Sequence, residues 1–469
     1  MLFSSVTFLF MFLPLLCLVC FLTDKKYHNF ILLLASIIFY AWGEPKFLFI
    51  MLLSVFINWL GAILIDMAKN IGSLKKFLLF FVVLANLSIL FYFKYFNFVI
   101  ENINNLFGGN FDFVKVVLPL GISFYTFQAL SYVIDVYRGE VKVQKSLYKT
   151  ALFICLFPQL IAGPIIKYHD IEEQIESREL SHDKVLTGVQ RFVAGLAKKV
   201  ILANTMGEVA DKIFSQSPDT FSHLTAWFGA IAYSLQLYFD FSGYSDMAIG
   251  LGLIFGFKFM ENFKYPYISK SITEFWRRWH ISLSTWFKEY VYIVLGGNRN
   301  GRLKQIRNLG IVFLLTGIWH GAAWTFIFWG IWNGFFIIFE KLTGWDKDSE
   351  KVGVKVLKHL YCITVFVTGW VIFRSDSLAY ACKYIKNMFG LINPSESDYL
   401  YAFPYYADGM SLFVFAAAIL CSLPIFKDFF SRKTFYGKVF AKIWLIVLLL
   451  CSSASIAVGT YNPFIYFRF

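Results

Sequence analysis

Residues 308–339 read NLGIVFLLTGIWHGAAWTFIFWGIWNGFFIIF, a run of 32 residues without any Asp, Glu, Lys or Arg. As one helix this run would be about 48 Å long, whereas the hydrocarbon core of a bilayer is about 30 Å thick. Basic segments flank it at 299–307 and 341–358, so both of its ends are expected in the cytoplasm. We therefore expect a broken or re-entrant helix pair that turns near Gly321, with irregular backbone that is buried in protein or lines a cavity.

The composition of the whole chain excludes a water-soluble enzyme, a disordered scaffold and a small disulfide-stapled domain. Of its 469 residues, 58% are hydrophobic and 16% are charged, whereas soluble domains carry about 25% charged residues. Apolar runs of near-spanning length recur at 1–22, 29–42, 48–66, 77–100, 115–136, 150–166, 222–256, 308–339, 358–374, 410–425 and 443–461. We expect an all-α polytopic membrane protein with about eleven or more membrane segments, in one domain over 1–469.

The net charge of +13 comes from basic residues that lie mainly in short loops between apolar runs. Anionic lipid and the excess of Lys and Arg in cytoplasmic loops explain this placement, so no nucleic-acid partner is expected. Acidic or neutral loops at 101–112 and 395–408 alternate with the basic ones, which places the N-terminus and the tail 463–469 outside. The seven Cys lie mostly in apolar segments and lack the spacing of a Cys/His site, so no metal is expected.

A second segment, residues 261–296, carries too much charge to span a membrane, yet its apolar residues recur at helical spacing. These residues are Phe275, Trp276, Trp279, Leu283, Trp286, Phe287 and Tyr290. The pattern predicts an interfacial helix that dips in from the cytoplasmic side.

Two histidines are candidates for chemistry. His320 lies in the middle of the charge-free run, where an ionisable side chain is costly and indicates a functional site, with a neutral core histidine as the alternative. His280 lies beside Arg277 and Arg278, either in a membrane-surface cluster or at a cytoplasmic mouth that binds phosphates. A neutral imidazole at depth above a basic entrance suits proton abstraction from a hydroxyl, as in an acyltransferase with a phosphate-bearing donor.

Two carboxylates favour a different class of protein. Asp240 and Asp246 lie in the apolar stretch LYFDFSGYSDMAIG, which is typical of an ion-coupled transporter or of tight helix packing through Gly and Ser. The loop that contains Asn298 follows a helical stretch and is more typical of a C-terminal turn than of a phosphate cradle.

Several segments, in order along nearly the whole chain, resemble the membrane-bound O-acyltransferase (MBOAT) family, and within it the bacterial branch that O-acetylates alginate and related polysaccharides. The most specific segments are WRRWHISLSTW and TGIWHGAAWTF. The resemblance implies a ring of tilted helices, with re-entrant and interfacial helices, around a central tunnel that joins the two faces of the membrane. It also implies that His320 is the catalytic histidine and that His280 supports it.

The resemblance further implies a donor and an acceptor. An acyl group, from acetyl-CoA or an acyl-carrier protein, would cross the bacterial cell membrane to an external SGNH-type partner that modifies a polysaccharide, with no tightly bound cofactor. D-alanyl transfer to teichoic acid and a non-enzymatic exporter or flippase are the alternatives. Arg277, Arg278, Trp279 and Asn298 are expected to bind the donor. Trp319, Trp324, Asp240, Asp246 and Asn333 are expected along the tunnel, although many relatives have His where this chain has Asn333.

The chain ends in PFIYFRF, an aromatic segment that by composition is an anchor at the membrane interface. In related systems an F-x-Y-x-x-F-like C-terminal motif is implicated in acyl relay, and Phe464, Tyr466 and Phe469 match it. A phenol is a reasonable acyl carrier, because its pKa near 10 makes its ester more reactive than that of an aliphatic alcohol. Tyr466 is therefore expected either to carry the acyl group or only to anchor the tail.

Overall fold

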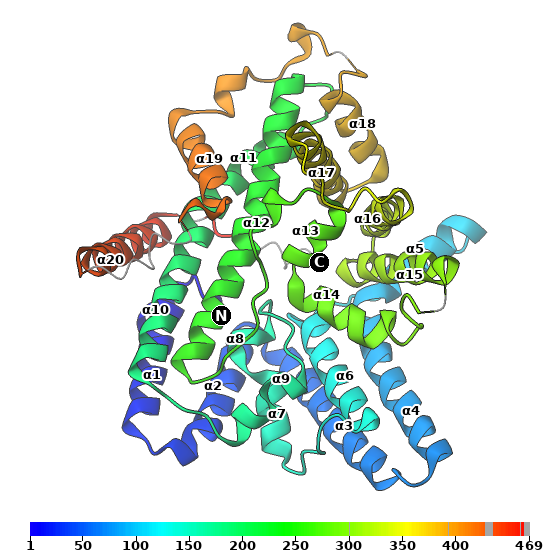
Figure 1. Cartoon of the computed structure of the whole chain (residues 1–469), viewed down its shortest axis with the longest axis vertical. Helices are drawn as coiled ribbons and strands as arrows, with labels where there is room; N and C mark the ends of the chain where they lie inside the picture. Colours follow the sequence, from blue (N-terminus) through cyan, green and yellow to red (C-terminus); the bar gives the residue numbers. More distant parts are fainter. Residues whose placement is uncertain (300, 393, 427–434, 460, 464–469) are drawn as a thin grey trace. The chain divides into compact units, whose positions relative to one another are not determined.

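The computed structural model describes residues 1–299, 301–392, 394–426, 435–459 and 461–463, and these residues form helices and loops without a β-strand (Figure 1). The all-α expectation is confirmed. Among the described residues, five helices are long and apolar enough to cross a membrane. They are Pro45–Met67, Gly72–Phe107, Trp324–Thr343, Val352–Arg374 and Val439–Val458. The chain is therefore a multi-pass membrane protein, with fewer such helices in this part than the eleven or more expected.

Two of the expected runs show why the number differs. Residues 150–166 contain two short helices, α7 (Leu147–Cys155) and α8 (Phe157–Leu160), since Pro158 has no backbone N–H and its ring would clash with the preceding turn. Residues 222–256 form one continuous helix, α12 (His223–Ile254), although they are longer than a single span requires. Its Ser, Gln and Asp side chains lower its hydropathy, and most of them are buried within protein.

Residue contacts divide the chain into two compact units. The first comprises 1–192 and 245–260, and the second comprises 193–244 and 261–469. Two helices, α10 (His182–Ala197) and α12, continue from one unit into the other. The single domain expected from the sequence stays a prediction.

The first unit is held together by aromatic rings and by a buried pair of amides. The ring of Phe157 lies 5.5 Å from that of Phe39 and 5.6 Å from that of Phe12. Asn58 and Asn86 exchange two side-chain hydrogen bonds, of 2.9 and 3.0 Å, which join α3 (Leu48–Met67) to α4 (Gly72–Leu90) and satisfy polar groups that lipid cannot solvate. The other helices that lie wholly in this unit, besides α7 and α8, are α1 (Leu13–Leu22), α2 (His28–Gly43), α5 (Phe96–Phe107), α6 (Ile122–Arg138) and α9 (Tyr168–Glu176).

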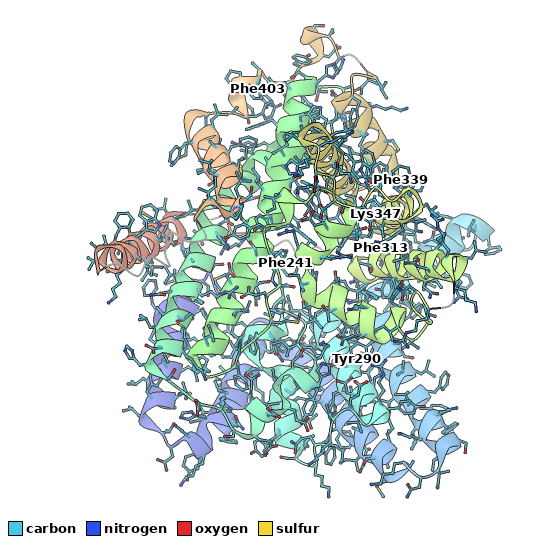
Figure 2. All side chains as sticks on the ribbon, in the orientation of Figure 1. Phe241, Tyr290, Phe313, Phe339, Lys347 and Phe403 are labelled. Atoms are coloured by element: carbon cyan, nitrogen blue, oxygen red, sulfur yellow. The ribbon has the colours of Figure 1, made fainter. Side chains whose placement is uncertain are left out.

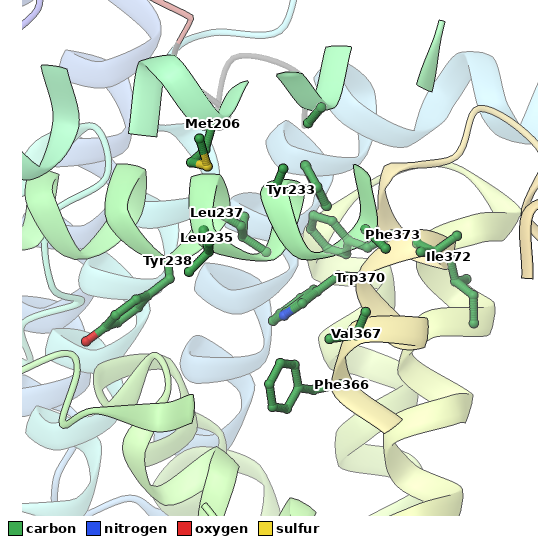
Figure 3. Close-up of a cluster of buried hydrophobic side chains, with 14 of the residues drawn as sticks. Met206, Tyr233, Leu235, Leu237, Tyr238, Phe366, Val367, Trp370, Ile372 and Phe373 are labelled. Carbon is green, nitrogen blue, oxygen red and sulfur yellow. The ribbon is translucent and has the colours of Figure 1, made fainter. Parts of the chain in front are cut away.

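The second unit has a core built mainly from aromatic residues of α12 and α17. Figure 3 shows Tyr233 and Leu237 of α12 in one buried cluster with Phe366, Trp370 and Phe373 of α17. The helices of this unit are α11 (Asn204–Phe214), α13 (Ile272–Arg278), α14 (Ile281–Phe287), α15 (Arg302–His320), α16 (Trp324–Thr343), α17 (Val352–Arg374), α18 (Leu378–Met388), α19 (Gly409–Cys421) and α20 (Phe435–Val458). A π-helical turn, η5 (Lys198–Ala203), leads from α10 into α11.

The single interfacial helix expected over 261–296 is wrong. The segment contains α13, α14 and the π-helical turn η7 (Lys288–Tyr292). The helical backbone is interrupted between α13 and α14, at Trp279 and His280. All seven apolar residues of the predicted pattern are buried. The helical periodicity therefore marks a face that packs into the protein core rather than one that lies on lipid.

Candidate functional site

His320 is the last residue of α15 and is 6% exposed. Its ring meets three aromatic rings nearly edge-on: Trp319 at 5.0 Å, Trp329 at 5.0 Å and Phe373 at 5.2 Å between centroids. These neighbours come from α15, α16 and α17, so three helices fix the position of the imidazole. The imidazole is therefore surrounded mainly by aromatic side chains.

The charge-free run forms the helix pair that its length and flanks predict. α15 ends at His320, Gly321 is extended, and α16 begins at Trp324. The two helices pack closely where Gly317 faces Gly330, since a Cβ on Gly317 would lie 2.5 Å from the carbonyl oxygen of Phe326. The expected break near Gly321 is confirmed, and it places His320 at the tip of a tight helical hairpin.

His280 is the residue that precedes α14, has a left-handed backbone (φ 44°, ψ 54°) and is fully buried. Its Nδ1 lies 3.2 Å from the Asn262 Oδ1, which also accepts from the Ser282 hydroxyl at 2.9 Å. Because that oxygen can only accept, His280 carries its proton on Nδ1, and Nε2 is the basic nitrogen. Burial lowers the pKa of His280 to about 3, so this imidazole is neutral at physiological pH.

The indole of Trp319 contacts both imidazoles. Its centroid lies 6.1 Å from the ring of His280 and 5.0 Å from that of His320. His280 also packs edge-on against Phe241 of α12, with 4.6 Å between the ring centroids. The two histidines singled out in the sequence thus both contact the indole of Trp319. Their catalytic and supporting roles stay predictions.

Two cavities share Thr273 and Arg277 of α13. The polar cavity has a volume of about 530 Å³, and the apolar cavity has a volume of about 230 Å³. Lys347 lines the polar cavity and Phe313 lines the apolar cavity, and both side chains are labelled in Figure 2. The basic residues of the polar cavity are Lys264, Lys270, Arg277, Arg278, Lys347, Lys355 and Lys358, and its acidic residues are Glu274, Asp346 and Asp348. The apolar cavity reaches Thr316, one helical turn before His320.

A third cavity, here called the Phe373 cavity, has a volume of about 220 Å³. It is lined by Tyr233, Gln236, Ala323, Thr325, Phe326, Phe373, Arg374, Ser375, Asp376 and Pro463. The ring of Phe373 borders this cavity and also packs on His320. His320 itself is not among the described lining residues of these cavities, but its neighbour Thr316 lines the apolar cavity and its ring neighbour Phe373 lines the Phe373 cavity.

Glu340 is a site residue that sequence reasoning missed. It is fully buried, and its carboxylate accepts hydrogen bonds from the backbone N–H groups of Ile272 (2.6 Å) and Thr273 (2.8 Å). These bonds satisfy the first turn of α13, whose last turn carries Arg277 and Arg278. Its position in the sequence could have indicated this role, because Glu340 is the first charged residue after the 32-residue apolar run.

Of the four residues expected to bind the donor, two line the polar cavity and two do not. Arg277 and Arg278 line the polar cavity, where Arg278 is also paired with Glu274 at 2.9 Å. In the part of the chain that the structure describes, neither Trp279 nor Asn298 lines the polar or the apolar cavity. Trp279 is instead buried in an aromatic stack, and Asn298 lies exposed in a turn.

The other residues expected along a tunnel also have defined positions. Asn333 is buried and accepts from the Trp276 indole at 3.1 Å, which joins α16 to α13. Trp324 is 56% exposed at the start of α16. Asp240 is ion-paired with Lys199 at 2.7 Å, and Asp246 is ion-paired with Arg191 at 2.8 Å. Tyr466 lies outside the described residues.

One group in the first unit has the composition of a metal site. The ligand atoms of Asp135, Glu140 and His169 lie within 4.8 Å of one another. However, the Nδ1 of His169 is hydrogen-bonded to Asp135 at 2.8 Å, and this bond raises the pKa of His169. The geometry is that of a histidine–carboxylate pair, and the absence of a metal stays a prediction.

Residues 139–379 match the model of the membrane-bound O-acyltransferase family. The chain is 41% identical to the probable alginate O-acetylase of Pseudomonas putida, over 100% of both chains. It is 36% identical to the peptidoglycan O-acetyltransferase of Helicobacter pylori, over 83% of this chain and 80% of that relative. The similarity to the teichoic acid D-alanyltransferase of Bacillus subtilis is 33% identity over 49% of this chain and 61% of that relative.

Proposed function

The chain belongs to the membrane-bound O-acyltransferase family, and from this premise we propose that it passes an acetyl group across the membrane for O-acetylation of a cell-envelope polysaccharide. The relatives that align over most of the chain are named for O-acetylation of alginate and of peptidoglycan. The observation that carries the proposal is the position of His320 beside two residues that line cavities: Thr316, one helical turn before it, lines the apolar cavity, and Phe373, whose ring packs on it, lines the Phe373 cavity. This arrangement supports a tunnel through a ring of helices.

Acetyl-CoA is the donor that we propose for the polar and apolar cavities. Seven basic and three acidic residues line the polar cavity, which suits the phosphates of CoA. Arg277 lies where the polar and apolar cavities meet, so a donor with its phosphates beside Arg277 can direct its pantetheine arm along the apolar lining towards Thr316. The basic cavity would then open to the cytoplasm.

In the proposed step, the basic nitrogen of His320 takes the proton from an acceptor hydroxyl as its oxygen attacks the thioester carbonyl. The new C–O bond forms, the C–S bond breaks, and the imidazolium returns the proton to the departing thiolate. His280 acts as a positioning residue, because it packs against Trp319, which contacts His320. General-base action of this kind contributes roughly 10²–10⁴-fold in rate.

The proposal extends to the acceptor side. Tyr466 would carry the acetyl group transiently and then pass it to an external SGNH-type partner that modifies the polysaccharide. We propose that the protein lies in the bacterial cytoplasmic membrane with both termini outside. The exporter alternative has less support, because Asp240 and Asp246 are both ion-paired with basic residues.

The purified full-length protein in detergent tests this proposal with labelled acetyl-CoA, by release of free CoA thiol. Arg277→Ala should raise KM for acetyl-CoA by about 10-fold or more with little change in kcat, because a charged hydrogen bond contributes about 1.5–3 kcal/mol. Lys304→Ala is the matched control, since Lys304 is exposed on α15 and lines neither donor cavity. Activity with an acyl-carrier protein but none with acetyl-CoA would overturn the proposed donor.

A further inference from the structure

The last described residues, Tyr461 to Pro463, are bound by side chains of α11 and η5. The hydroxyl of Tyr461 donates to the Asp211 Oδ2 at 2.7 Å. The side-chain amide of Asn204 donates to the carbonyl of Tyr461 at 3.2 Å, and the ammonium of Lys199 donates to the carbonyl of Pro463. Two of these three bonds are made to backbone carbonyl oxygens. They therefore fix the path of the backbone and do not depend on the side chains of this segment.

The charged groups that hold this segment are themselves fixed from a second side. Asp211 is paired with Arg374 of α17 at 2.6 Å. Lys199 is paired with Asp240 of α12 at 2.7 Å, and both of these side chains are nearly buried, at 4% and 2% exposed. A donor or acceptor held in an ion pair keeps its orientation, so the binding groups are preorganised for the segment.

The space for Tyr461 depends on a glycine. A Cβ on Gly207 of α11 would lie 2.8 Å from the Tyr461 hydroxyl and 2.6 Å from the Gln236 amide nitrogen. The same segment reaches the Phe373 cavity, because Pro463 lines this cavity together with Gln236. Tyr461 is therefore seated in a fitted position at the edge of the cavity whose Phe373 packs on His320.

We propose that Lys199, Asn204 and Asp211 form a socket that binds Tyr461–Pro463 and sets the point at which the C-terminal tail reaches the Phe373 cavity. This inference rests on the proposed function, in which the acceptor side of the reaction lies at that cavity. The socket residues are positioning residues: they act on the tail and not on the acetyl group. Asp240, for which the sequence left ion binding open beside a structural role, is here the partner that orients Lys199.

The test uses Tyr461→Phe, which removes only the hydroxyl, and Asp211→Asn, which removes the charge of its acceptor. Two readouts are measured on the full-length protein: CoA thiol released from labelled acetyl-CoA, and acetyl groups passed to polymer in cells. We expect acetyl transfer to polymer to fall about 10-fold and thiol release to fall with it, because the proposed first acceptor, Tyr466, belongs to the tail that the socket positions. The double variant should be no worse than Asp211→Asn alone, because both substitutions act on the same hydrogen bond, whereas Asp211→Asn also removes the ion pair with Arg374. Tyr405→Phe, an exposed tyrosine of the same unit, is the control.

A second measurement does not depend on activity. Hydrogen–deuterium exchange followed by mass spectrometry should show the peptide that contains Tyr461 and Asn462 protected in the wild type and less protected in Tyr461→Phe and in Asn204→Ala. Gly207→Ala should have the same effect, because the added methyl group would lie 2.6 Å from the Gln236 amide nitrogen and 2.8 Å from the Tyr461 hydroxyl. Wild-type exchange and wild-type transfer in these variants would overturn the socket. Thiol release that is unaffected by His320→Ala would overturn the proposed function instead.

Discussion

His280 combines two unfavourable features at one residue. A left-handed backbone costs a non-glycine residue roughly 1–2 kcal/mol, and a buried imidazole gives up its hydration. The hydrogen bond to Asn262 and the edge-on contact with Phe241 offset part of this cost. Strain of this kind is concentrated at functional sites, where surrounding structure holds a side chain in place. Here it turns the imidazole towards Trp319, the neighbour of His320.

The pKa of His280 predicts how stability depends on pH. An unfolded histidine has a pKa of about 6.5, whereas the pKa of His280 in the fold is about 3, so the unfolded chain binds more protons between these values. His280 therefore contributes stability that is lost as the pH falls from 6.5 towards 3. The loss from this residue is about 2 kcal/mol between pH 7.5 and pH 5.

Thermal unfolding in detergent at pH 7.5 and pH 5 measures this effect. His280→Asn is the informative variant, because asparagine tolerates a left-handed backbone and does not titrate. Its melting temperature should fall less between the two pH values than that of the wild type. Equal decreases in both proteins would show that His280 is not held neutral by the fold.

At the scale of elements, the hairpin of α15 and α16 was predictable from the sequence, whereas the break between α13 and α14 was not. A 32-residue run without charge cannot fit one span, so its length forces a turn. The break at His280 instead depends on a positive φ at a non-glycine residue, which hydrophobic periodicity does not encode. Similarly, Trp279 shares the helical pattern of its neighbours, and tertiary packing directs it into the core and away from the donor cavities.

The close contact within the hairpin gives a prediction with an internal control. Gly317→Ala places a Cβ 2.5 Å from the Phe326 carbonyl oxygen and should cost about 1–3 kcal/mol, with loss of acetyl transfer as His320 shifts. Gly310→Ala lies on the same helix in open space and should be neutral or stabilising by up to about 1 kcal/mol. Melting temperatures and thiol release measured on both variants check this. Equal behaviour of the two alanines would mean that helix contact at Gly317 does not position the site.

At the scale of the whole molecule, the membrane topology follows from the distribution of loop charge. Basic residues before and after the hairpin predict that Glu350 is cytoplasmic, and the acidic loop 395–408 predicts that Ser397 is external. In a cysteine-free background, a membrane-impermeant maleimide should label Ser397→Cys in intact cells. The same reagent should label Glu350→Cys only after permeabilisation. Labelling of Glu350→Cys in intact cells would reverse the orientation and place the proposed donor cavity outside.

The candidate site itself was partly predictable from the sequence. His320, His280 and the two arginines stand out because charge is rare in this chain, and a rare ionisable group in an apolar context indicates function. The roles of Glu340, Lys199 and the segment at Tyr461 depend on contacts between residues far apart in the chain, which a single sequence does not reveal.

The central claim is that His320 is the base that activates the acceptor. The most direct measurement is the rate of acetyl transfer from labelled acetyl-CoA by His320→Ala, compared with the wild type and with His182→Ala, which removes an exposed histidine. We predict that His320→Ala loses roughly 10²–10⁴-fold in rate while its abundance in the membrane and its melting temperature stay close to those of the wild type. The His182→Ala variant should retain full activity. A wild-type rate in a folded His320→Ala protein would contradict this account.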